Sequence, residues 1–209
     1  MRGHVRNLSG SVRLGLVLGR ARTMLGFAAL LPLAWTAPAP PRRYIVQPGS
    51  RFWIEGSSTV GRYTCRARRV DGEATVSSEA PLTGQAVLSA EVRSFDCGQP
   101  QMNRDLARAL RADRQPRVLL TVERVDVGES TRGNMPVSAE GTLRLAGVER
   151  PVAFRASAQT LANGQVRITG QYVLRMSDFD VTPPSGMLGL VRAHDRVLAR
   201  FDVVAAAGR

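Results

Sequence analysis

Alternation of apolar and polar residues dominates the second half of the chain. In residues 166–176 the apolar side chains of Val166 and Ile168 alternate with polar ones such as Arg167. A period of two is typical of a β-strand with one buried face. The same alternation predicts strands over residues 85–95, 117–127, 141–145, 151–158 and 196–204, with further β-prone runs at 52–54 and 63–70.

Dipeptides that contain glycine mark the turns between these strands. Asn163-Gly164 predicts a hairpin that joins residues 153–160 to the strand beginning at residue 165. Ala146-Gly147 separates another pair of strands. Asp71-Gly72 predicts a further hairpin, because Asp-Gly between two β-prone runs favours a tight turn. Turns at such short intervals are typical of antiparallel sheets.

One segment has the period of a helix instead. Met102, Leu106 and Leu110 recur every four residues, and Asn103 is a suitable amino-terminal cap, so we expect one amphipathic helix over residues 103–112. The rest of the chain offers about eight strands, each with one apolar face. We therefore predict an all-β fold, a single antiparallel barrel or sandwich with one short inserted α-helix. Closure into a barrel is favoured because it leaves no exposed edge strand.

Composition adds the question of charge. The 209 residues carry 29 basic and 17 acidic side chains, for a net charge of +12, and every basic residue is an arginine. Without lysine, Schiff-base catalysis and a P-loop nucleotide site are excluded. Eight of the arginines precede Glu55, the first acidic residue, so about two thirds of the excess charge is amino-terminal.

The amino-terminal charge belongs to an export-signal pattern. Basic residues end at Arg22, an apolar run follows over residues 24–35, and small residues and prolines occupy 36–41. This order predicts a secretory signal over residues 1–39 and hence a periplasmic or secreted protein. Twelve residues span roughly 18 Å as a helix, short of a bilayer core of about 30 Å. An uncleaved anchor or a buried helix is the alternative.

The remaining arginines do not indicate nucleic-acid binding. They are spread among apolar residues, and the chain after residue 39 has nine aromatic residues scattered along it. A nucleic-acid site would need a basic cluster with interleaved aromatic side chains. We therefore expect no nucleic-acid partner.

Candidate catalytic residues are few. His194 is the single histidine after residue 39, and neither Asp195 nor Ser185 gives it the spacing of a metal site or of a nucleophile elbow. Asp178 and Asp180 lie two residues apart, whereas a general acid and base face each other across a cleft. We predict no enzymatic activity, no metal and no cofactor.

Cys65 and Cys97 are the two cysteines of the chain. An even number of cysteines in an exported protein favours a disulfide, so we predict a bond between them. Two buried free thiols are the alternative. A redox pair is disfavoured because the Cys-x-x-Cys spacing is absent.

An apolar run occupies a loop rich in proline and glycine. Met187, Leu188, Leu190 and Val191 follow Pro183-Pro184, where we expect the chain to lie at the surface. Such a loop can form a lid over the mouth of a barrel, a surface for a partner or a membrane, or a plug that folds onto the short helix. The sequence alone leaves these alternatives open.

The order of several segments resembles the YceI-like family of exported bacterial proteins, over residues 44–204. The most specific part is Gly-x-Leu-x-Leu-x-Gly-Val-x-Arg-Pro-Val at residues 141–152, followed by Ser177-Asp178-Phe179. Many members have glycine after that phenylalanine, and this chain has Asp180. The supporting segments are residues 56–60, 92–98, 115–118, 195–197 and 201–202.

The resemblance implies a lipocalin-like barrel that encloses a polyisoprenoid, such as a quinone or a prenyl phosphate, as a periplasmic carrier or store. Alternation indicates which side chains point inward, but leaves open whether they fill a dry core or leave a channel. The alternative function is a structural or stress-related interaction protein with a filled barrel. A homodimer and a transient membrane contact also stay open. The candidate ligand-binding residues, inside the barrel and at its mouth, are Phe52, Ile54, Leu120, Val122, Leu143, Phe154, Ile168, Tyr172, Leu174, Met176, Met187, Leu188 and Phe201.

Overall fold

The computed structural model describes residues 39–186 and 190–208, and these residues form mostly β-strands. The predicted signal at residues 1–39 lies almost wholly outside them. The helical elements are α1 (Pro100–Ala109) and the 3-10 turns η1 (Val92–Ser94) and η2 (Met176–Phe179). The strands are β1 (Arg42–Val46), β2 (Arg51–Ser58), β3 (Gly61–Ala67), β4 (Asp71–Val76), β5 (Leu82–Glu91), β6 (Phe95–Asp96), β7 (Arg117–Val127), β8 (Asn134–Leu145), β9 (Val148–Thr160), β10 (Val166–Arg175), β11 (Ser185–Gly186), β12 (Val191–Arg192) and β13 (Arg196–Ala207).

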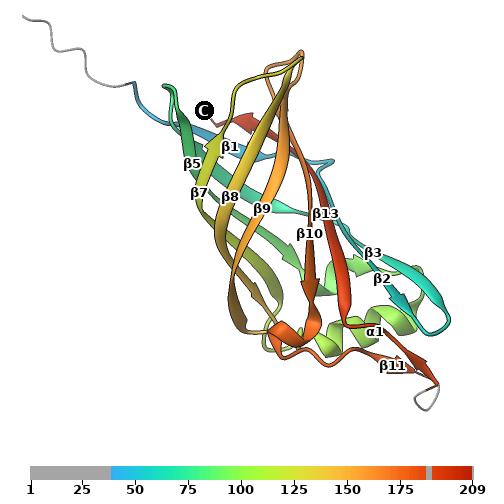
Figure 1. Cartoon of the computed structure of the whole chain (residues 1–209). Helices are drawn as coiled ribbons and strands as arrows, with labels where there is room; N and C mark the ends of the chain where they lie inside the picture. Colours follow the sequence, from blue (N-terminus) through green and yellow to red (C-terminus); the bar gives the residue numbers. More distant parts are fainter. Residues whose placement is uncertain (1–38, 187–189, 209) are drawn as a thin grey trace, which may run out of the picture. The chain divides into compact units, whose positions relative to one another are not determined.

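Eight strands close into an antiparallel barrel (Figure 1). They follow the order β1-β4-β5-β7-β8-β9-β10-β13, and β1 pairs again with β13 to complete the ring. The predicted all-β barrel with one inserted α-helix is therefore confirmed. Within the described residues, no helix is long and apolar enough to cross a membrane.

Strand β13 joins three other strands. It pairs with β10 along ten residues, with β2 through its middle and with β1 at its carboxyl end. Between β1 and β2, residues 47–50 interrupt the strand pairing with β13, although Gln47 and Ser50 still form hydrogen bonds with Val204. The sheet divides there. Beyond this break β1 pairs with β4, whereas β2 pairs with β3, which in turn pairs with β6. The β2–β3 hairpin thus extends from the barrel wall as a branch.

Two of the predicted turns are confirmed. Asn163-Gly164 connects β9 to β10, with Thr160 opposite Val166 and Gly164 at φ +78°. Ala146-Gly147 connects β8 to β9, and both residues have positive φ values, +50° and +87°. Positive φ at both central residues gives the turn the twist that neighbouring strands require.

The predicted hairpin at Asp71-Gly72 is wrong. Both residues lie inside β4, which pairs with β1 and β5. Gly72 is required by close packing, because a Cβ at this position would lie 2.4 Å from the carbonyl oxygen of Val87 on β5. The glycine that suggested a turn therefore permits a close approach of two backbones.

The helix begins earlier than predicted. Gln99 is the cap, and Pro100 occupies the first turn, where the missing N–H of proline has no cost. Asn103 lies inside the helix, and its Oδ1 accepts a hydrogen bond from the backbone N–H of Cys97 at 2.7 Å. The asparagine therefore anchors the segment before the helix instead of capping it.

Asp180, at the position where the resemblance led us to expect glycine, has a backbone conformation that glycine favours. It ends η2 with φ +53° and ψ +31°, in the left-handed region. Glycine adopts this conformation without steric cost, and aspartate is among the few other residues that tolerate it. Asp180 is therefore compatible with the left-handed backbone that ends η2.

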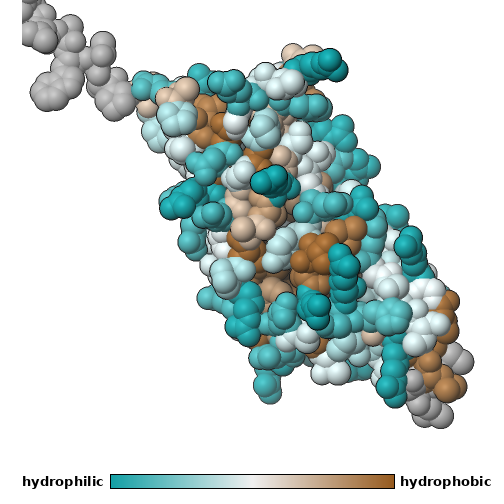
Figure 2. All heavy atoms as spheres, viewed as in Figure 1, coloured by the Kyte–Doolittle hydropathy of each residue, from teal (hydrophilic) through white to brown (hydrophobic). Residues whose placement is uncertain are grey.

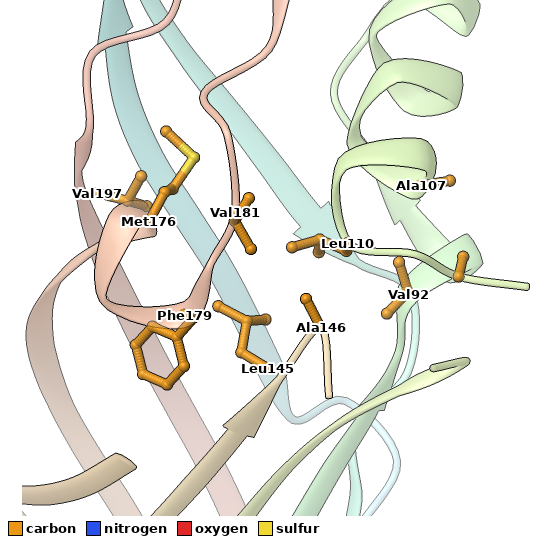
Figure 3. Packing of buried hydrophobic residues seen from close by; sticks show 10 residues of the cluster. Val92, Ala107, Leu110, Leu145, Ala146, Met176, Phe179, Val181 and Val197 are labelled. Carbon is orange, nitrogen blue, oxygen red and sulfur yellow. The ribbon is translucent and has the colours of Figure 1, made fainter. Parts of the chain in front are cut away.

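Hydrophilic (teal) residues are widespread on the side shown in Figure 2, with hydrophobic (brown) patches between them along the barrel wall. A cluster of buried apolar residues lies at the end of the barrel that carries α1 (Figure 3). Leu110 from the end of the helix, Leu145 from β8, and Phe179 and Val181 from around η2 pack together there. This cluster holds the helix and the η2 segment against one end of the barrel.

The outer face of β13 carries a buried carboxylate, Asp202, which is 6% exposed. Arg167 on β10 donates two hydrogen bonds to it, at 2.7 Å from Nε and 2.6 Å from Nη2. Arg51 on β2 forms a second ion pair with the same carboxylate. The hydrogen bonds from Arg167 are the largest cause that lowers the pKa of Asp202, and Arg51 adds to their effect. Burial alone would raise this pKa, but the net result is a pKa lowered from 3.8 to about 2.

The substitution Asp202→Asn tests this junction. Because the pKa of Asp202 is lowered in the folded protein, the ionised carboxylate stabilises the fold above about pH 4. That contribution is lost as the pH falls from about 4 towards 2. We expect Asp202→Asn to reduce the free energy of unfolding by about 2 kcal/mol at pH 7, and by much less at pH 2. Denaturant unfolding at both pH values measures the difference.

Glu140→Gln provides the matched control. Glu140 and Arg124 form an ion pair at 3.1 Å on the barrel exterior, and both side chains are more than half exposed. An exposed pair of this kind contributes less than about 1 kcal/mol. Equal losses of stability in the two variants would contradict a special role for Asp202.

Candidate functional site

A cavity of about 910 Å³ lies inside the barrel. All eight strands of the closed ring contribute to its wall, together with β2, β3 and α1. The lining side chains are mostly aliphatic or aromatic because each strand turns its apolar face inward. This volume lies at the upper end of the range for small-molecule sites in proteins. The sequence left open whether the interior is filled or hollow, and the structure has it hollow.

The predicted inward residues lie on the wall of this cavity. Met187 and Leu188 lie outside the described residues, so their positions stay a prediction. That the lining residues contact a ligand is likewise a proposal, taken up below. The predicted residues that line the cavity are Phe52, Ile54, Leu120, Val122, Leu143, Phe154, Ile168, Tyr172, Leu174, Met176 and Phe201.

Small inward side chains leave the interior unfilled. The predicted set favoured large residues and omitted the alanines that lie between them on the same wall. Their signal was present in the sequence, since they occupy the same alternate positions, but their small size gave no reason to select them. The omitted lining alanines include Ala139, Ala156, Ala158, Ala199 and Ala205.

Three aromatic rings form one side of the cavity. Phe154 packs edge-on against Phe201, with ring centroids 5.8 Å apart, and against Tyr172 at 6.4 Å. The Phe201 ring lies over Gly170, its partner on β10, where an added Cβ would come within 2.3 Å of the ring. The glycine therefore lets the ring lie against the strand, so that the space in the middle of the barrel stays open.

Polar side chains gather where the cavity reaches the gap between β3 and α1. Arg62 and Tyr63 of β3 and Gln101 and Asp105 of α1 line the cavity there. Arg108 and Gln101 bind the Asp105 carboxylate, at 3.0 Å each. Arg62 makes no ion pair within the described part of the chain. Burial raises the pKa of the Tyr63 hydroxyl.

The predicted disulfide between Cys65 and Cys97 is confirmed. Cys65 lies on β3, is 1% exposed and lines the cavity, and Cys97 precedes α1. Phe95 and Phe52 pack beside this bond, with ring centroids 5.8 Å apart. The disulfide thus ties the segment that leads into α1 to the barrel wall.

Removing this disulfide should destabilise the protein markedly. The bond closes a loop with a sequence separation of 32. For the double variant Cys65→Ala/Cys97→Ala we expect a loss of about 3 kcal/mol in the free energy of unfolding. Without the cross-link, the unfolded chain has more conformational entropy, which favours unfolding. Denaturant unfolding of both proteins gives this difference.

Thiol titration in denaturant provides the check on the wild-type protein. No thiol should react before reduction, and two should react afterwards, because the chain has two cysteines. Thiols that titrate without reductant would refute the bond.

The catalytic candidates do not form a triad in the described residues. His194 Nδ1 lies 2.9 Å from Ser57 Oγ, whereas Ser185 pairs with Arg192 between β11 and β12. Asp195 points elsewhere: it accepts hydrogen bonds from the backbone N–H and the hydroxyl of Ser177, which lower the pKa of its carboxyl. The Ser–His contact is exposed and lacks the carboxylate that orients a catalytic histidine. Within residues 39–186 and 190–208 there is also no cluster of potential metal ligands.

A closed antiparallel barrel with an apolar cavity defines a lipocalin-like fold. A match to the YceI-like domain family covers residues 46–205, and the chain belongs to that family. The family predicted from the sequence motifs is therefore confirmed.

Solved structures share this fold. BcnA from Burkholderia cenocepacia has a TM-score of 0.62 at 18% identity, over 77% of this chain and 99% of its own. A polyisoprenoid-binding domain from Saccharophagus degradans, implicated in plant cell wall breakdown, has a TM-score of 0.61 at 18% identity, over 79% of this chain and 98% of its own. At this identity the likeness concerns the fold alone. No match was found among curated proteins.

Proposed function

We propose that the protein binds a long apolar lipid, a polyisoprenoid, inside its barrel and serves as a periplasmic carrier or store. The observation that carries this proposal is the hollow interior of about 910 Å³ with an apolar wall. An interior of this kind suits a hydrocarbon chain, whereas a barrel with a purely structural role would be filled by side chains. The polyisoprenoid-binding domain of the same fold supports the choice of lipid.

The hydrophobic effect supplies enough free energy for such binding. Burial of each CH₂ group contributes about 0.8 kcal/mol, so every five-carbon isoprene unit contributes several kcal/mol. Loss of translational and rotational freedom costs about 4–15 kcal/mol, which a few buried units offset. No polar anchor is required for affinity, and the polar residues between β3 and α1 then serve to accommodate the head group.

Two features support a location outside the cytosol. The amino-terminal sequence has the pattern of a secretory signal. The disulfide between Cys65 and Cys97 requires an oxidising compartment to form and persist. The proposal includes no catalytic step. It assigns the binding role to the eleven described lining residues and, from the sequence alone, to Met187 and Leu188.

A bulky side chain placed inside the cavity should weaken lipid binding. Ala156 faces the interior on β9, whereas Ala153 of the same strand is exposed on the outside. We expect Ala156→Phe to weaken the binding of a fluorescent polyprenyl analogue at least about tenfold, equivalent to about 1.4 kcal/mol. The reason is that the new ring occupies the space of the ligand. Fluorescence titration of purified protein measures the affinity.

Ala153→Phe is the control, since it adds the same ring to the outer face and should leave the affinity unchanged. Thermal unfolding of both variants verifies that they fold. Binding that survives in Ala156→Phe, or a wild-type protein that binds no polyprenyl analogue, would refute the proposal.

A further inference from the structure

Two large apolar side chains are far more exposed than any others in the described residues. Val60 is 73% exposed and Leu190 is 75% exposed, whereas the next most exposed, Val87 and Val173, are near 42%. Val60 lies at the tip of the β2–β3 hairpin, and Leu190 directly precedes β12. These positions are 130 residues apart in the chain, so no sequence periodicity relates them.

Hydrogen bonds hold the two residues at one place. The Thr59 hydroxyl donates to the carbonyl oxygen of Leu190 at 3.1 Å, and the Thr59 N–H donates to the carbonyl oxygen of Arg192 at 3.0 Å. Ser58 and Ala193 form a β-bridge beside them. Val60 and Leu190 therefore form one apolar projection, which we call the rim patch. In Figure 2, hydrophobic (brown) spheres gather at this end of the barrel domain, where Figure 1 labels β11.

The rim patch is continuous with the cavity. Val60 and Arg62 on the β2–β3 hairpin and Val191 beside Leu190 all line the cavity. A side chain that is both exposed and part of the cavity wall lies at the opening. The rim patch thus lies beside an opening of the apolar cavity, and is not an isolated spot on the barrel wall.

The surrounding charge is positive. Near the tip, residues 56–64 contain Arg62, and residues 181–194 contain Arg192. Residues 56–64 contain no carboxylate. Residues 181–194 likewise contain no carboxylate. Arg62, next to the rim patch, makes no ion pair within the described part of the chain. An apolar tip flanked by arginines complements an anionic phospholipid surface, where apolar side chains enter the acyl boundary and cations meet the head groups.

We infer that the rim patch docks the opening of the barrel onto an anionic phospholipid bilayer, with Val60 and Leu190 inserted at the head-group boundary. The purpose of this docking rests on the proposed lipid-carrier function, since a prenyl lipid then moves between bilayer and cavity without crossing water. The docking itself does not depend on a ligand in the cavity. Experiments can therefore disprove docking on a bilayer without disproving lipid binding in the cavity, and the reverse.

An environment-sensitive fluorophore tests insertion at single positions. Val60→Cys, Leu190→Cys and Val87→Cys proteins, recovered after expression of the full chain, are labelled at the new thiol with a nitrobenzoxadiazole dye. On addition of vesicles of phosphatidylcholine and phosphatidylglycerol, the dye at positions 60 and 190 should shift its emission to the blue. The dye at position 87, on the barrel wall, should not. High salt, or vesicles of phosphatidylcholine alone, should reduce the shift because the attraction is partly electrostatic.

Charged variants provide the second measurement. Val60→Asp and Leu190→Asp should each weaken binding to these vesicles about tenfold, while Val87→Asp should leave it unchanged. The polyprenyl affinity of Leu190→Asp, measured without vesicles, should equal that of the wild type, because Leu190 is not part of the cavity wall. This measurement separates docking from cavity binding. Equal shifts at all three labelled positions, or no shift at 60 and 190, would overturn the inference. A shift that appears without vesicles and rises with protein concentration would also overturn it, and would identify a second copy as the occupant.

Discussion

The ion pairs of Asp202 hold the strand on which the barrel depends. Strand β13 is the common partner of β10, β1 and β2, and the ring closes only through it. Asp202 lies on its outer face near the break at residues 47–50, and binds Arg167 of β10 and Arg51 of β2. A buried carboxylate is tolerated there because two guanidinium groups neutralise it. The outside of the barrel thus carries the polar interactions that secure closure, and the inside is left to apolar side chains.

Because the eight strands close into a ring, the apolar face of each strand lines one common cavity. Every inward position contributes to one shared interior, and alanines at several of these positions leave about 910 Å³ unfilled. Gly170 also keeps space open inside the barrel, because the absence of a Cβ lets the Phe201 ring lie against the wall. Apolar packing at the α1 end and the disulfide of Cys65 and Cys97 close part of one end. The rim patch lies where the cavity opens beside the β2–β3 hairpin. The same barrel therefore has both features on which the two proposals rest, the apolar cavity and the exposed rim patch.

Local signals predicted much of this fold. The strand at residues 117–127 has the predicted bounds, the Asn163-Gly164 hairpin forms, and the cysteine pair is bonded. Alternation also identified lining residues, since it determines which way a side chain points. It does not determine how far apart facing strands lie, so alternation alone left the hollow interior open, and only the family resemblance implied it. Gly72 was assigned to a turn because the need for close backbone packing appears only once β4 and β5 are paired. The rim patch depends on contacts across 130 residues and had no local signal beyond the apolar loop.

Native mass spectrometry of the protein purified from its own host tests the central claim most directly, since it requires no choice of ligand. The account predicts a folded protein that carries one lipid per chain, with a fragmentation pattern of repeating isoprene units, and loss of that lipid in Ala156→Phe. Repeated observation of folded protein without any bound lipid, from membranes that contain prenyl lipids, would contradict it.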